Sequence, residues 1–144
     1  MPSLVSVPTL PEHLLLLKMR DEERAAFSTR PELFIEALRR TGTRTVLCGT
    51  EVVCVLTWQE VAPGVCEVAL IPSESLDKHG VAAARHIRGA LVYFTCQYRR
   101  VQAATDDARK YKRFMRFLGF SLEGVFHKYY PDGSNLLAWG KVWR

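Results

Sequence analysis

Residues 106–120 read DDARKYKRFMRFLGF, a basic segment with helical periodicity that stops at a glycine. Phe114, Phe117 and Leu118 are three and four residues apart, which places them on one helix face and predicts that this face is buried. Gly119 suits the left-handed turn that commonly ends a helix. An apolar stretch begins at the next residue, so we expect this helix to lead directly into a strand.

The segments upstream predict a parallel crossover. Residues 65–71 and 101–105 are strand-like, and residues 81–98 between them carry apolar side chains at helical spacing. A strand, a helix and a second strand in this order form a βαβ unit.

The remaining segments predict mainly antiparallel pairs. Tight turns are expected at residues 49–51, 62–64 and 131–133. Thr9 as the cap, Pro11 in the first turn and Glu12 as the partner in a capping box predict the start of a helix, and a similar pattern from residue 29 predicts a second one. The expected order is β-αα-βββ-α-β-α-ββ, an α+β class with a mixed sheet, in a single domain over residues 1–144.

Composition excludes several classes of protein. The 144 residues carry a net charge of +5 and are 48% hydrophobic, which is ordinary for a globular domain. No stretch reaches the roughly 18 apolar residues of a membrane span. No signal peptide is visible, so we expect no secretion. The four cysteines form no Cys-x-x-Cys pair and the four histidines no ligand pattern, so we expect buried free thiols and no metal site.

The element order, together with the Leu-Gly-Phe helix end, resembles the GNAT acyltransferase superfamily. The resemblance implies a sheet splayed between its two middle strands, with acyl-CoA in the gap and its pyrophosphate on the backbone at the start of the long helix. The family pattern there, Arg/Gln-x-x-Gly-x-Gly/Ala, aligns with residues 77–82. The cofactor-binding candidates are Lys78, His79, Gly80, Val81 and Ala82.

One residue of this loop departs from the family. Asp77 stands where the family has a cation or an amide, and its repulsion of phosphate could cost about 1–4 kcal/mol. Simple entry into a helix is the alternative interpretation of Gly80 and Ala82. We therefore expect no cofactor in a degenerate loop, or acetyl-CoA if the chain is active.

The catalytic candidates are Glu67 and Tyr111. Many family members place a tyrosine acid where this chain has Met115, which cannot donate a proton. Tyr111 lies one turn earlier on the same face, as a substitute acid or as a packing residue. Glu67, between apolar neighbours in its strand, is either a general base with a raised pKa or an outward-facing carboxylate.

A narrower resemblance is to GNAT-like proteins of tailed bacteriophages, including the small internal virion protein of short-tailed phages. The matching segments are residues 71–75, 112–120 and 129–133. It implies a virion-associated structural or assembly protein, made in the host cytoplasm, that binds other phage proteins through their acidic surfaces. An active acyl-CoA-dependent N-acetyltransferase is the alternative, and a nucleic-acid-binding module is the third hypothesis.

The basic helix supplies the expected interaction surface. Its cationic residues cannot all face the core with the aromatic ones, so an exposed strip is predicted. The strip consists of Arg109, Lys112, Arg113 and Arg116. Its partner would be an acidic protein surface, with DNA as a second possibility and a merely solvated face as the alternative.

Overall fold

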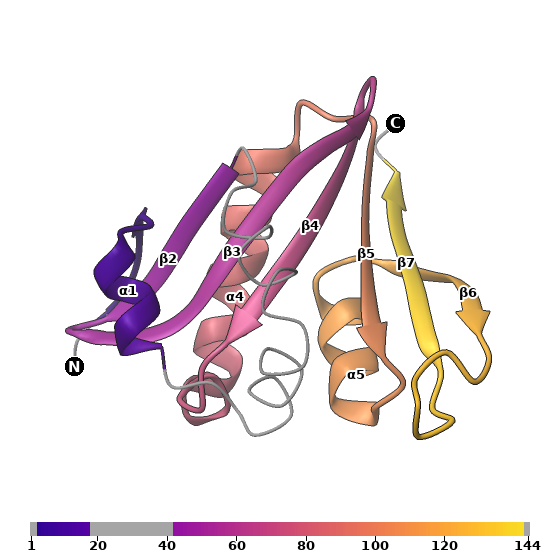
Figure 1. Cartoon of the computed structure of the whole chain (residues 1–144). Helices are drawn as coiled ribbons and strands as arrows, with labels where there is room; N and C mark the ends of the chain where they lie inside the picture. The colour runs from indigo at the N-terminus through magenta and orange to yellow at the C-terminus, as the bar shows by residue number, and fades with distance from the viewer. Residues whose placement is uncertain (1–2, 18–41, 143–144) are drawn as a thin grey trace. The chain divides into compact units, whose positions relative to one another are not determined.

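The computed structural model describes residues 3–17 and 42–142 (Figure 1). The helix expected from residue 29 lies outside the described residues. The observed elements are β1 (Leu4–Pro8), α1 (Pro11–Leu16), β2 (Gly42–Cys48), β3 (Glu51–Ala62), β4 (Val65–Pro72), α4 (Leu76–Thr95), β5 (Arg100–Asp106), α5 (Arg109–Phe117), β6 (Ser121–Phe126) and β7 (Leu136–Val142).

The strands form one seven-stranded mixed sheet in the order β1-β2-β3-β4-β5-β7-β6. The pairs β1–β2, β2–β3, β5–β7 and β6–β7 are antiparallel. β4 and β5 run parallel, with Val65–Glu67 in register with Arg100–Gln102. The α+β class and the parallel crossover are therefore confirmed.

The chain divides into two compact units, each of which takes two segments of the sequence. The first unit contains residues 1–59 and 69–86, and the second contains residues 60–68 and 87–144. The expectation of a single domain over residues 1–144 stays a prediction.

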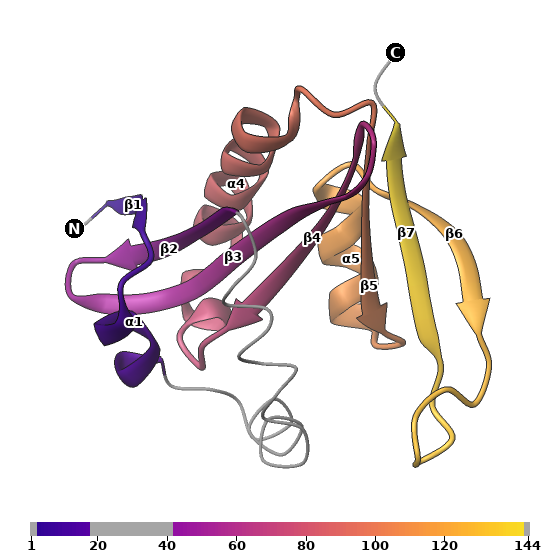
Figure 2. The ribbon, with the colours of Figure 1, turned by 45° about the horizontal axis from the view of Figure 1, so that its top comes forward.

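In the first unit, helices cover both faces of the β-sheet. α1 and the first half of α4 lie on opposite sides of β2 and β3 (Figures 1 and 2). Six consecutive residues of β3, 52–57, are buried, as expected for a strand covered on both faces. β2 and β3 are joined by a tight turn at residues 49–50, where Gly49 has a φ of +63°.

The start of α1 differs from the predicted capping box. The N-terminal cap is Leu10, and its backbone N–H donates to Nδ1 of His13 at 2.9 Å. Thr9 instead accepts a hydrogen bond from the Thr45 hydroxyl, which ties the segment before α1 to β2. The predicted roles of Thr9 and Glu12 as cap and box partner were wrong, because a histidine took the reciprocal position.

In the second unit, the core gathers around β5, β7 and α5. Trp139 and Leu137 of β7 are buried, and the Trp139 indole N–H donates to the Thr105 hydroxyl at 2.8 Å. On α5 the buried residue is Met115, with Leu118 directly after the helix. The predicted burial of Phe117 was wrong, since this residue is 37% exposed, and Phe114 is only half-buried.

The C-terminal end of α5 agrees with the prediction, whereas the helix begins later than the sequence pattern indicates. Gly119 has a φ of +94°, which confirms the predicted left-handed ending. The helix begins only at Arg109, with Ala108 as its cap, because Asp106 is still part of β5. Asp107 does not cap the helix by hydrogen bonding; its carboxylate contacts Lys112 and Asn135 instead.

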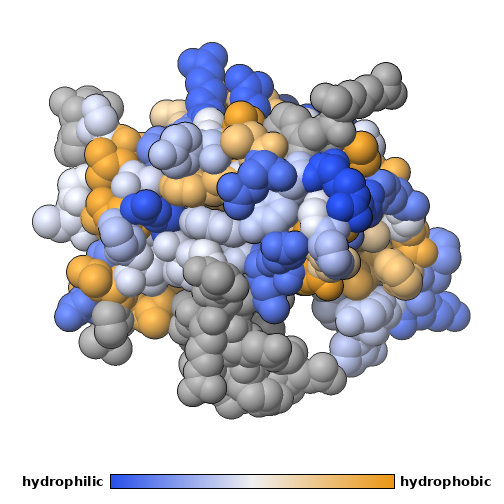
Figure 3. All heavy atoms as spheres, turned by 90° about the horizontal axis from the view of Figure 1, so that it is seen from above, coloured by the Kyte–Doolittle hydropathy of each residue, from blue (hydrophilic) through white to orange (hydrophobic). Residues whose placement is uncertain are grey.

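Apolar and reactive side chains at the surface are scattered. Figure 3 shows apolar side chains on one face separated by hydrophilic ones. All four cysteines are free. The expectation that all are buried holds for Cys54 and Cys66 but was wrong for Cys48, which is half-buried, and for Cys96, which is exposed. Burial raises the pKa of the Cys54 thiol to about 12.

Within residues 3–17 and 42–142 no helix is long and apolar enough to span a membrane, and no group of ligands is placed to hold a metal ion.

Candidate functional site

The long helix α4 is interrupted near its start. Residues 76–79 form one helical turn, and Gly80 then adopts non-helical angles, φ +47° and ψ −120°. A regular helix follows from Val81 to the end of α4. Gly80, Val81 and Ala82 are all exposed, and a Cβ built on Gly80 would meet no atom within 4 Å. The regular helix therefore starts at an accessible surface with open space over a glycine.

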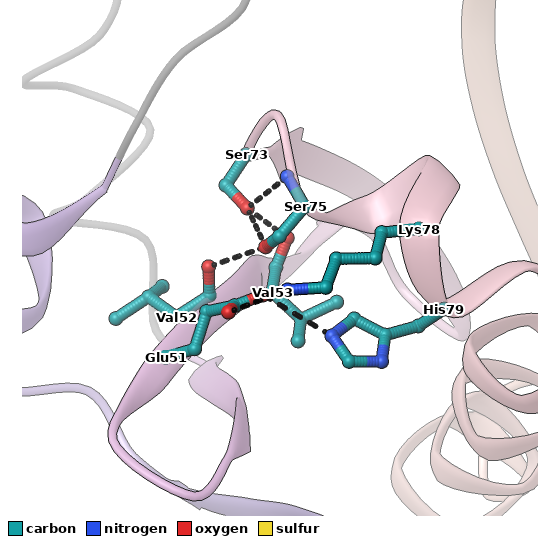
Figure 4. Close-up of polar contacts among 7 residues, drawn as sticks. All are labelled: Glu51, Val52, Val53, Ser73, Ser75, Lys78 and His79. Carbon is teal, nitrogen blue, oxygen red and sulfur yellow. Dashed lines mark hydrogen bonds and ion pairs between the residues drawn. The ribbon is translucent and has the colours of Figure 1, made fainter.

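Two serines fasten the loop before this turn to β3. The Ser73 hydroxyl donates to the Val53 carbonyl at 2.9 Å, and the Ser75 hydroxyl lies 3.2 Å from the Val52 carbonyl (Figure 4). The backbone N–H groups of Ser73, Ser75 and Leu76 are also hydrogen-bonded within the loop or to β3. Because these three donors are engaged, a ligand that needs backbone N–H groups must take them from later residues.

A third contact to β3 comes from Glu51. Its carboxylate lies 3.3 Å from Nζ of Lys78 and 3.2 Å from Nε2 of His79 (Figure 4). Hydrogen bonds from His79 and Ser75, together with Lys78, hold the pKa of Glu51 below its ordinary value. Lys78 and His79 thus bind a carboxylate of the chain itself. The sequence did not predict Glu51 as part of this site, because nothing in its spacing connects it to residues 78–79.

Glu67 lies in the second unit, in the parallel part of β4. Its neighbours Cys66 and Val68 are buried, while Glu67 is half-buried on the opposite face of the strand. Nε2 of Gln102 lies 3.5 Å from its carboxylate, and Oε1 of Gln102 accepts from Arg100 at 3.2 Å. The alternation favours the outward-facing interpretation, and the role of Glu67 as a base stays a prediction.

The face of α5 on which a general acid is expected is partly buried in the core. Met115 is buried, and Tyr111 on the same face is half-buried, with Nζ of Lys110 5.1 Å from its ring centre. Tyr111 as an acid stays a prediction. A second phenol, which was not predicted from the sequence, is Tyr130, whose pKa is raised by burial and by its hydrogen bond to Asp106.

The four residues of the predicted basic strip differ in whether they form an ion pair. Arg109, Arg113 and Arg116 are exposed and, in the described part of the chain, form no ion pair. Lys112 is different, since its Nζ lies 2.7 Å from Oδ1 of Asp107. We call Arg109, Arg113 and Arg116 the arginine stripe. It lies on the side of α5 opposite Met115 and Leu118.

Comparison of whole structures shows the GNAT acetyltransferase fold. Ard1 from Thermoplasma volcanium superposes with a TM-score of 0.77 at 15% identity, covering 97% of each chain. A GNAT-family acetyltransferase from Bacillus anthracis gives 0.72 at 14% identity, covering 96% of this chain and 94% of the other. An acetyltransferase from Bacillus subtilis, solved in complex with CoA, gives 0.71 at 14% identity over the full length of both chains.

Comparisons of sequence add no closer relative. No protein-family model matches the chain, and no curated protein matches it. At identities this low, the structural likeness shows the fold alone. The closer resemblance to bacteriophage proteins therefore stays a prediction.

Proposed function

We propose that the chain is an acyl-CoA-dependent N-acyltransferase that holds its cofactor at the start of the regular part of α4. The observation that carries this proposal is the interruption at Gly80, which leaves Gly80, Val81 and Ala82 exposed at a helix start with open space beside them. Acyl-CoA is also the cofactor that the fold implies, and one structural neighbour is a CoA complex.

The residues at this helix start fit a phosphate group. Backbone N–H groups in the first turn of a helix lack partners within the helix and point along a favourable dipole. Gly80, Val81 and Ala82 bring no charge and no large polar side chain that would block access to those groups. They would hold the pyrophosphate, and the bound cofactor would supply an activated acyl thioester. Asp77, one turn earlier, lowers the affinity without removing the donors.

Proton transfer would fall to two residues of the second unit. Glu67 is the candidate base that accepts a proton from the attacking amine, since it is the only carboxylate of β4. Tyr111 is the candidate donor on α5, because Met115 has no proton to give. Neither assignment is needed for the cofactor to bind, so binding and catalysis can be tested separately.

The test is calorimetric titration of acetyl-CoA into the whole chain, followed by an assay of CoA release with primary amines and peptide N-termini as acceptors. Chromatographic detection of CoA is preferable to a thiol reagent, because the exposed thiol of Cys96 would react. We expect saturable binding in the micromolar range and acyl transfer to at least one acceptor. Absence of saturable binding would contradict the proposal.

A second candidate is a virion-associated phage protein that keeps the fold without the chemistry. Two observations favour it: Met115 is buried at the position of the family acid, and the arginine stripe is exposed without an intramolecular partner in the described chain. The stripe would bind acidic surfaces of other virion proteins, in the host cytoplasm or in the particle. Acetyl-CoA binding with acyl transfer would exclude this candidate, whereas neither activity would favour it.

A further inference from the structure

The carboxylate of Glu51 occupies a small site for anions. Each of its oxygens has its own partner, Lys78 for Oε2 and His79 for Oε1 (Figure 4). A carboxylate only accepts hydrogen bonds, so Nε2 of His79 must carry the proton in this contact. Two donors aimed at two oxygens of one anion are equally suited to two oxygens of a phosphate.

This anion site lies directly before the proposed cofactor site in the sequence. Lys78 and His79 end the helical turn that Gly80 separates from the regular helix. Both side chains are engaged with Glu51 instead of being free for a phosphate at residues 80–82. The carboxylate therefore competes for these donors and also repels an anion that approaches them.

The contact is open enough to be exchanged. The side chains of Lys78 and Glu51 are 68% and 39% exposed, so solvent screens their attraction. Glu51 is the first residue of β3 and follows the turn at residues 49–50, so its side chain can rotate away without displacing the strand. The Ser73 hydroxyl holds the loop to β3 through the Val53 carbonyl without contacting Glu51, and the Ser75 hydroxyl, which also hydrogen-bonds Glu51, contacts the Val52 carbonyl as well.

We propose that Glu51 is a built-in competing anion, which binds Lys78 and His79 in the free chain and is displaced by a phosphate of acyl-CoA. This inference rests on the proposed function and adds a residue that sets the affinity of the same site. Its consequence is that removing a carboxylate, which ordinarily weakens a network of ion pairs, should strengthen ligand binding here.

The experiment compares acetyl-CoA binding to the wild type, Glu51→Gln and Glu74→Gln by calorimetry. Glu74 is an exposed carboxylate in the same loop that contacts neither Lys78 nor His79, so its variant controls for a general change of charge. We expect Glu51→Gln to bind at least about threefold more tightly. Glu74→Gln should stay within about twofold of the wild type, because screened charges contribute little.

Two ligands related to acetyl-CoA identify the phosphate that displaces Glu51. Acetyl-pantetheine carries no phosphate, so the gain from Glu51→Gln should vanish with it. Acetyl-dephospho-CoA keeps the pyrophosphate and lacks the 3′-phosphate. A gain that persists with it assigns displacement to the pyrophosphate, and a gain that is lost assigns it to the 3′-phosphate; either result supports the competition. An equal gain with acetyl-pantetheine would overturn it.

The two proposals fail in different ways. If the wild type binds acetyl-CoA and Glu51→Gln binds equally or more weakly, Glu51 positions the turn and the competition is overturned while the proposed function stands. If neither binds, the proposed function fails and the competition falls with it. Should Glu51→Gln not fold, Glu51→Asp replaces it, since the shorter side chain withdraws the carboxylate; it must then bind acetyl-CoA more tightly than the wild type.

Discussion

The carboxylate of Glu123 in β6 forms a bidentate ion pair with the guanidinium of Arg100 in β5, although β7 lies between these strands. An irregularity in β6 between Leu122 and Gly124 places Glu123 outside the regular register. Its side chain crosses β7 at Gly140, where a Cβ would overlap the carboxylate. A side chain at position 140 would therefore displace the Glu123 carboxylate from its ion pair, while the backbone conformation there does not demand glycine.

Gly140→Ala should destabilise the fold by at most about 1 kcal/mol, because the new methyl group overlaps the Glu123 carboxylate, which ends a flexible side chain and can move aside. Moving aside gives up the half-exposed ion pair with Arg100, which contributes about 0–1 kcal/mol. Chemical denaturation measures the change. Gly124→Ala, in β6 with no atom within 4 Å of the new Cβ, is the matched control and should cost nothing.

The same prediction can be checked by a mutant cycle. In a Glu123→Ala background the carboxylate is absent, so Gly140→Ala should cost much less than in the wild type. An equal cost in both backgrounds would show that something other than Glu123 excludes a side chain at position 140.

Gly119→Val should destabilise the chain by more than about 1 kcal/mol, because a branched side chain is strained at the φ of +94° found there. Gly119→Asn should cost less, since asparagine tolerates left-handed angles better. Thermal melting of the two variants ranks them. Equal melting temperatures for Val and wild type would mean that α5 ends differently in solution.

Asp107 should make the fold sensitive to acid. Hydrogen bonds from Lys112 and Asn135 lower the pKa of its carboxyl below 3.8. A carboxyl with a lower pKa in the folded chain stabilises that state above its ordinary pKa, and this contribution is lost as the pH falls through the folded value. Asp107→Asn should therefore melt below the wild type near neutral pH, and the difference should shrink below about pH 3.8. A difference that is constant with pH would contradict this account.

The arginine stripe should govern any association of the chain with acidic partners. Arg109, Arg113 and Arg116 changed together to Glu should abolish salt-sensitive binding in a particle-association or pull-down assay, because the attraction is electrostatic. Lys110→Glu, an exposed cation beside the stripe, is the control and should have a smaller effect. Binding to DNA instead of protein in the same assay would support the nucleic-acid hypothesis, and unchanged association of the triple variant would leave the stripe as plain solvated surface.

The order of elements could be predicted because each boundary has a local cause. Gly119 ends α5, the turn at residues 131–133 closes the last hairpin, and period-two strands flank a period-three-to-four helix. These signals depend on neighbours in the sequence. The side of α5 that becomes buried does not depend on sequence neighbours. Met115 and Leu118 face the core, while Phe117 lies under the guanidinium of Arg88, which is 4.5 Å from the centre of its ring.

The candidate site could be predicted only in part, for the same reason. Gly80, Val81 and Ala82 follow from a short local pattern at a helix start. Glu51 is more than twenty residues from Lys78, and its contact exists only because Ser73 and Ser75 hold the loop against β3. A contact of this kind depends on the folded backbone and leaves no spacing signal in the chain.

The central claim is that the start of the regular part of α4 holds the phosphates of acyl-CoA, and Val81 offers the most direct measurement. Val81 is exposed, and an aspartate there suits the first turn of a helix, so Val81→Asp should fold normally. Its charge would repel phosphate by about 1–4 kcal/mol, whereas Val81→Asn has nearly the same shape without the charge. We predict that Val81→Asp binds acetyl-CoA at least about tenfold more weakly than Val81→Asn at an unchanged melting temperature. Equal affinities for the two variants would contradict the account.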